Sequence, residues 1–209
     1  MAGFHVRRHA GLAGRIRRRL GICVNTLAQL STNAKGLPVA FAMRAALARP
    51  TMGDAASFLA SADHASGQTY QLGDRTGVTT LECSANSVAT VPLISRRSPH
   101  TNHPLANNDA RDAQVSLSGS VNSRARLESL RVDLDPDRFP RIGVDDLKTA
   151  LSACRAGGEV SIEATAASAM TEPTTFGAAI FEIGETVRAS ICAGPPSSGT
   201  WRTFKLRSP

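Results

Sequence analysis

Residues 21–47 constrain the fold more than any other stretch, because a strand, a polar loop and a helix follow one another there without interruption. The apolar residues of segment 22–27 favour a β-strand, and segment 31–36 has the composition of a turn. Pro38 suits the first turn of a helix, where its missing N–H costs no hydrogen bond. The residues expected on the buried stripe of that helix are Val39, Met43, Ala46 and Leu47.

The rest of the chain alternates between groups of strands and groups of helices. The expected elements are a second helix capped by residues 51–54, a hairpin over 69–83, an edge strand over 88–94, a loop over 100–108, helices over 121–130 and 144–154, a second hairpin over 175–192 and a last strand over 201–206. This order predicts the α+β class rather than a parallel array of βαβ units.

The net charge of +7 comes almost entirely from one end of the chain. Six arginines and no acidic residue lie within residues 1–20; without them, 18 basic residues face 17 acidic residues. Binding along a nucleic-acid backbone needs basic residues spread over a folded face, so we expect no nucleic-acid partner. We expect segment 1–20 to be poorly ordered, and residues 21–209 to form one domain.

Membrane and compartment signals are weak. No apolar run reaches the ~18 residues that would suggest a membrane span. The arginine-rich start lacks the serines of a transit peptide and the apolar core of a secretory signal. The cysteines show no CxxC spacing, so they predict buried thiols in a reducing cytoplasm rather than a zinc site or a redox pair. They are Cys23, Cys83, Cys154 and Cys192.

Several short motifs, in the same order, resemble the acyl-coenzyme A:6-aminopenicillanic acid acyltransferase family of the N-terminal-nucleophile hydrolase superfamily. The motifs are Gly21-Ile22-Cys23-Val24-Asn25-Thr26-Leu27, Gly36-Leu37-Pro38-Val39, Arg44-Ala45-Ala46-Leu47, Leu81-Glu82-Cys83 and His100-Thr101-Asn102-His103. The resemblance begins near residue 11 and covers only the later part of a family member. It implies an αββα sandwich that is incomplete at its N-terminal edge, with residues 21–209 as a partial domain.

Asn102 is the first candidate site residue. The resemblance implies that its side-chain amide donates to the oxyanion of a tetrahedral intermediate, a role in which a rigidly held neutral donor is effective. The alternative is that Asn102 only caps a loop between Pro99 and Pro104. His100 and His103 beside it are a weak pattern for a metal site, and hydrogen bonding within the loop is the other role open to them.

Arg124 is the second candidate, because the resemblance implies a cation near the nucleophile. Such a cation would lower the pKa of a cysteine thiol and hold a substrate carboxylate. The alternative is a solvated helix face that carries Arg124, Arg126, Glu128 and Arg131.

The cysteine nucleophile of the family, usually preceded by glycine, has no counterpart here, because the sequence contains no Gly-Cys pair. The resemblance implies an enzyme that moves an acyl group from an N-acyl amide or an acyl thioester through an acyl-enzyme, without a cofactor or a metal. We expect this chain alone to be inactive. The alternative is a decayed, non-catalytic fragment that acts at most as a binding module. We also expect the strand over 21–27 to lie at an open sheet edge and to promote self-association.

Overall fold

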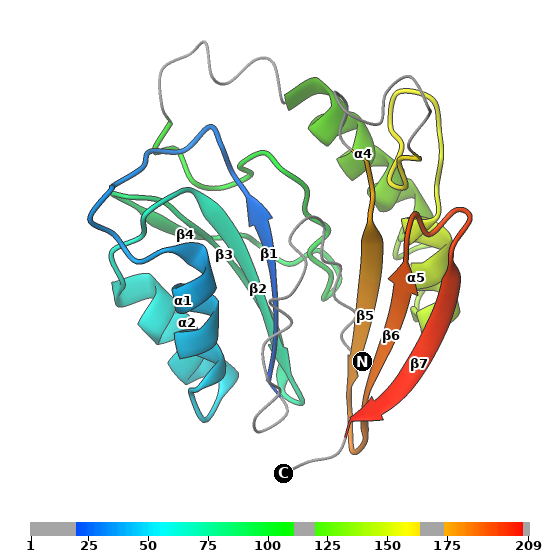
Figure 1. Cartoon of the computed structure of the whole chain (residues 1–209), viewed down its shortest axis with the longest axis horizontal. Coiled ribbons are helices and arrows are strands. Elements are labelled where there is room, and N and C mark those ends of the chain that lie inside the picture. The colour runs from blue at the N-terminus through cyan, green and yellow to red at the C-terminus, as the bar shows by residue number, and fades with distance from the viewer. Residues whose placement is uncertain (1–19, 111–119, 164–173, 207–209) are drawn as a thin grey trace.

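The structure is a computed structural model, and it describes residues 20–110, 120–163 and 174–206. Helices and two antiparallel sheets make up these ranges, so the chain has the α+β composition that the sequence predicts (Figure 1). Segment 1–20, for which we expect poor order, lies outside the described residues except for Leu20. No helix among the described residues has both the length and the apolar character needed to cross a membrane.

The first sheet has the strand order β1-β2-β3-β4. Its strands are β1 (Gly21–Thr26), β2 (Gln68–Asp74), β3 (Gly77–Cys83) and β4 (Val88–Thr90). The hairpin expected over 69–83 is therefore present, with Asp74 paired to Gly77 next to its turn. The strand expected over 88–94 ends at Thr90, because Pro92 has no N–H to continue the ladder.

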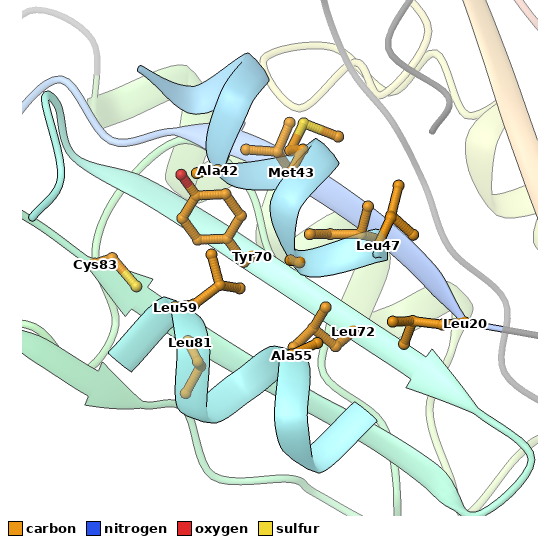
Figure 2. Close-up of a cluster of buried hydrophobic side chains, with 13 residues drawn as sticks. Leu20, Ala42, Met43, Leu47, Ala55, Leu59, Tyr70, Leu72, Leu81 and Cys83 are labelled. Atoms are coloured by element: carbon orange, nitrogen blue, oxygen red, sulfur yellow. The ribbon is translucent and has the colours of Figure 1, made fainter. Parts of the chain in front are cut away.

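Helices α1 (Val39–Leu47) and α2 (Met52–Ser61) cover one face of this sheet (Figure 1). Pro38 is the N-cap of α1, and the Thr51 hydroxyl oxygen accepts the N–H of Asp54 at 3.1 Å to cap α2, as the sequence predicts. Figure 2 shows the core between the helices and the sheet, where Tyr70 lies among leucines of both layers. Its members include Leu20, Ala42, Met43, Leu47, Ala55, Leu59, Tyr70, Leu72, Leu81 and Cys83.

Gly36 allows the loop before α1 to approach the end of α2 closely. A Cβ atom at this position would lie 2.4 Å from the carbonyl carbon of His64. Leu37 and His64 form a bridge there, with the N–H of Ala65 donating to the carbonyl of Leu37 at 3.1 Å. The glycine of the Gly36-Leu37-Pro38 motif therefore sets the distance between the loop and α2.

The second sheet has the strand order β5-β6-β7. It consists of β5 (Gly177–Ile183), β6 (Val187–Ala193) and β7 (Thr200–Leu206), and its outer face packs against α4 (Ser120–Asp133) and α5 (Val144–Leu151). The helix expected over 144–154 ends at Leu151 instead.

The two sheets face each other between the two helix pairs, so the layers run helices, sheet, sheet, helices (Figure 1). Cys23 of β1 packs against Phe181 and Ile183 of β5 and Ala189 of β6. The inner face of the second sheet is thus apolar. The inner face of the first sheet carries the polar residues Asn25, Thr69, Gln71, Thr80 and Glu82, and the candidate site is built on it.

Candidate functional site

Glu82 of β3 anchors the loop that follows β4. Its side chain has no solvent exposure and accepts a 2.6 Å hydrogen bond from Nε2 of His100. Its two oxygens also accept the backbone N–H groups of residues 105–107, at 2.6, 2.9 and 2.7 Å. One carboxylate therefore fixes the loop on both sides of Thr101 and Asn102.

Charge stabilises this anchor. Burial alone raises the pKa of Glu82, but the hydrogen bonds from His100 and from the three backbone N–H groups outweigh it and leave the pKa below its usual value. His100 directs Nε2 at Glu82 and Nδ1 at the carbonyl oxygen of Thr101, 2.7 Å away. Both nitrogens thus lie within hydrogen-bonding distance of an oxygen, and Glu82 and His100 form a buried ion pair when His100 is protonated.

Asn102 is held by groups from three other parts of the chain. Its N–H donates to the hydroxyl of Ser123 at 2.8 Å, and its carbonyl oxygen accepts Nε2 of Gln29 at 3.2 Å. Its side-chain Oδ1 accepts from Arg126 at 3.3 Å, and its Nδ2 donates to the carbonyl oxygen of Thr26 at 3.2 Å. Because arginine only donates and a carbonyl only accepts, these two contacts fix the orientation of the amide.

The second N–H of the Asn102 amide has no acceptor among the described residues. Asn102 also lines a cavity of about 10 Å³, which is about the smallest volume that holds one water-sized group. The residues that line this cavity are Asn25, His100, Thr101, Asn102, Arg126, Leu130 and Val160. Arg126 is only 7% exposed, so it places a positive charge beside the cavity, where solvent screens it little.

Ser123 and His103 form a buried pair behind Asn102. The Ser123 hydroxyl lies 2.9 Å from Nδ1 of His103 and 3.0 Å from the hydroxyl of Thr101. Burial, followed by the charges of Arg124 and His100, lowers the pKa of His103 to about 4, so it is neutral at pH 7. Ser123 is fully buried, so the pair serves to hold the loop rather than to attack a substrate. The loop hydrogen bonds expected for His100 and His103 are present.

The structure brings Arg126, rather than Arg124, to Asn102. Arg124 is exposed on α4, and its proposed contact with a substrate stays a prediction. The solvated helix face that the sequence suggested is wrong for Arg126, which is buried. The spacing of Ser123, Leu127 and Leu130 could have shown this, because Arg126 lies between these positions on the same face of the helix.

Three of the four cysteines are buried as predicted, but Cys154 is exposed. Burial raises the pKa of Cys23 well above its usual value, and burial together with the charge of Glu82 raises the pKa of Cys83 to about 12. Burial also raises the pKa of Cys192. These three thiols are therefore poor nucleophiles at neutral pH. Within the described ranges, no group of three histidine, cysteine or acidic residues is placed to hold a metal ion.

Comparison with known families agrees with the family that the sequence motifs indicate. The family model described as acyl-coenzyme A:6-aminopenicillanic acid acyl-transferase matches residues 9–181, which is most of the chain. A search of curated proteins returned no match. The matched range includes β1, Glu82, the Asn102 loop, α4 and α5. The chain therefore belongs to the acyl-coenzyme A:6-aminopenicillanic acid acyl-transferase family.

Proposed function

We propose that this chain supplies the oxyanion-stabilising part of a site that moves an acyl group between an amide or thioester and an amine or water. The observation that carries the proposal is the amide of Asn102, which two side-chain contacts orient while one N–H stays uncommitted among the described residues. Such a donor needs no reorganisation when negative charge develops on a carbonyl oxygen. Losing one typically costs ~10²–10³ in rate.

Two arginines complete the proposed site. Arg126 donates to Oδ1 of Asn102, and its charge polarises the amide and favours an anion in the adjoining cavity. Arg124 is exposed on the same helix, where it can reach a carboxylate of the substrate. The substrate we propose is a small N-acyl amide or acyl thioester rather than a nucleic acid.

The nucleophile we propose is a cysteine other than the four in this sequence. Cys23, Cys83 and Cys192 are buried with raised thiol pKa values. Cys154 is exposed, but its sulfur contacts the carbonyl oxygens of Ser152 and Ser161, and Cys154 is absent from the residues lining the Asn102 cavity. We therefore propose that none of these four cysteines forms an acyl-enzyme and that this chain alone is inactive.

We also propose that the layers belong to an αββα sandwich of the N-terminal-nucleophile hydrolase type that is incomplete beside β1. The order of layers in Figure 1 supports this assignment, as does the edge position of β1 among the described strands. A reducing compartment such as the cytoplasm suits four free thiols. The second candidate function is a non-catalytic binding module, which would fit the finding that no cysteine is among the described residues lining the Asn102 cavity.

Amine release from a panel of N-acyl amides tests these alternatives. The 209-residue chain should show no turnover. If an in-frame extension upstream of Met1 encodes a Gly-Cys pair, the extended protein should cleave itself before that cysteine and then turn over a substrate. Asn102→Ala should lower kcat ~10²–10³-fold in the extended protein. Asn108→Ala is the matched control, because Asn108 is an exposed asparagine of the same loop.

Mass spectrometry measures the self-cleavage directly. Turnover by the 209-residue chain that disappears when one of its own cysteines is changed would refute the proposed source of the nucleophile. An extended enzyme in which Asn102→Ala and Asn108→Ala behave alike would refute the role of Asn102. An extension without a nucleophile, or none in frame, would favour the binding module.

A further inference from the structure

A second and much larger cavity extends along β5, which is an edge strand of the second sheet among the described residues. Its volume is about 750 Å³, which lies within the range of ~300–1,000 Å³ that is typical of small-molecule sites. Its walls come from β2, β3, β5 and α5, from Leu130 of α4, and from residues 93–100 and 140–143. We propose that this cavity binds an amphiphilic anion, that is, an alkyl chain with a carboxylate or phosphate head group.

The interior of the cavity suits an alkyl chain. Its lining includes large aliphatic side chains from α4, α5 and β5: Leu130, Val144, Leu147, Leu151, Ile180 and Ile183. Leu130, Leu151, Ile180 and Ile183 are buried in the protein, so the wall they form is apolar and fixed by packing. Transfer of methylene groups from water to such a wall is favourable.

The rim of the cavity suits an anionic head group. Arg75, Arg96 and Arg141 come from three separate segments of the chain, and all three are exposed. None of them forms an ion pair or a side-chain hydrogen bond within the described part of the chain. Three guanidinium groups that line one cavity and have no partner among the described residues attract an anion, and their planar donors match the geometry of carboxylate and phosphate.

The other charged groups of the cavity do not cancel this attraction. Arg97 donates to the backbone carbonyl groups of Leu134 and Phe139, so it ties residues 93–100 to the end of α4. Asp74 accepts the N–H groups of Met52 and Thr76, so its charge is already compensated by backbone donors. Glu182 is then the one remaining acidic residue that lines the described cavity, against three uncommitted arginines.

This inference does not depend on the proposed acyl transfer. His100 and Leu130 line both cavities, so the two sites are neighbours. None of the three rim arginines lines the small cavity beside Asn102. Asn102→Ala should therefore leave binding in the larger cavity unchanged, and failure of one proposal would not imply failure of the other.

Isothermal titration calorimetry on the full chain tests the site with defined probes. Octanoate, decanoate and dodecanoate should bind with affinities that rise ~3- to 4-fold for each added CH₂ group. Decyl phosphate should bind as well if the rim accepts either head group, and a preference between it and decanoate would identify the head group. Decyltrimethylammonium, which has the same chain and the opposite charge, should not bind measurably.

Variants separate the rim from the interior. The triple change Arg75→Gln, Arg96→Gln and Arg141→Gln should weaken decanoate binding about 10-fold and leave the binding of neutral decanol unchanged. A control triple of exposed arginines outside the cavity, Arg44→Gln, Arg188→Gln and Arg202→Gln, should change neither. Leu147→Trp should weaken decanoate and decanol alike by filling the interior.

Three results would overturn the proposal. They are equal binding of decanoate and decyltrimethylammonium, affinities that do not rise with chain length, and a decanoate affinity that the rim triple does not change. If Leu147→Trp does not fold, the chain-length series still decides whether an apolar interior holds the ligand.

Discussion

Changing Glu82 to Gln should destabilise the protein severely without changing the volume of the side chain. Each Glu82 oxygen accepts two hydrogen bonds, from His100 and Leu105 on one side and from Ala106 and Asn107 on the other. A glutamine side chain has one oxygen and one NH₂ group. In either orientation of its amide, the NH₂ group would face two of these four N–H donors and could not accept their hydrogen bonds. Two lost hydrogen bonds to a charged group cost about 1.5–3 kcal/mol each. Removing one partner of a buried ion pair costs about 3–5 kcal/mol, which is a second estimate of the same loss. We therefore expect the free energy of unfolding to fall by about 3–5 kcal/mol.

Urea denaturation at pH 7 measures the free energy of unfolding. With a slope of about 2 kcal/mol per molar urea, the expected loss shifts the midpoint by roughly 1.5–2.5 M. Glu128→Gln is the matched control, because Glu128 is 63% exposed on α4 and forms an ion pair with the exposed Arg131. The free energy of unfolding of this variant should differ from the wild-type value by less than about 0.5 kcal/mol. A Glu82→Gln protein within 1 kcal/mol of the wild type would refute the ion-pair anchor.

The pH dependence gives an independent check on the same residue. The folded-state pKa of Glu82 is lowered relative to the unfolded value of about 4.3, so its contribution to stability is fully present above about pH 5. It is lost as the pH falls through the folded-state pKa. The difference in unfolding free energy between wild type and Glu82→Gln should therefore shrink below about pH 4, whereas a purely steric defect would keep it constant.

Three further predictions follow from burial and charge. Iodoacetamide should label Cys154 in the native protein, and it should label Cys23, Cys83 and Cys192 only after unfolding. Peptide mass spectrometry identifies which cysteines are labelled. Rapid labelling of Cys23 in the native protein would contradict its burial. The pKa of His103 is about 4 in the folded protein, below the value of about 6.5 in the unfolded chain, so the protein should lose stability as the pH falls from 6.5 to 4. His103→Gln should remove that part of the pH dependence of unfolding. An unchanged pH profile in this variant would contradict the burial of a neutral His103. Because β1 is an edge strand among the described residues, the protein should self-associate in analytical ultracentrifugation, whereas a monodisperse monomer across the concentration series would argue against an open edge.

The strands and helices could be predicted from the sequence because their cores are periodic. The sequence pattern placed Met43, Ala46 and Leu47 on one stripe of α1, and the structure buries all three. Alternation likewise located β6, where Val187 and Ala189 are buried. Helix ends were less predictable: α4 continues to Asp133 rather than ending at residue 130, and α5 ends at Leu151 rather than at residue 154.

The polar inner layer could not be predicted in the same way. In the segment Leu81-Glu82-Cys83, apolar and polar residues alternate, which is the pattern of a strand with one face in solvent. The structure instead buries Glu82, because the loop through Asn107 covers that face. Periodicity shows which residues share a face of a strand, but it does not show what covers that face.

The motifs nevertheless carried the missing information, because two of them meet in space. Glu82 and His100 lie 18 residues apart in the sequence and form the buried pair that anchors the loop. Thr26 at the end of β1 lies 76 residues from Asn102, and its carbonyl oxygen accepts a hydrogen bond from the Asn102 side-chain amide. The position of Asn102 thus depends on the pairing of β1 with the rest of the sheet and on the buried side chain of Glu82. A change at Glu82 that spares folding should therefore still displace Asn102, because the loop is held by Glu82 at residue 100 and at residues 105–107.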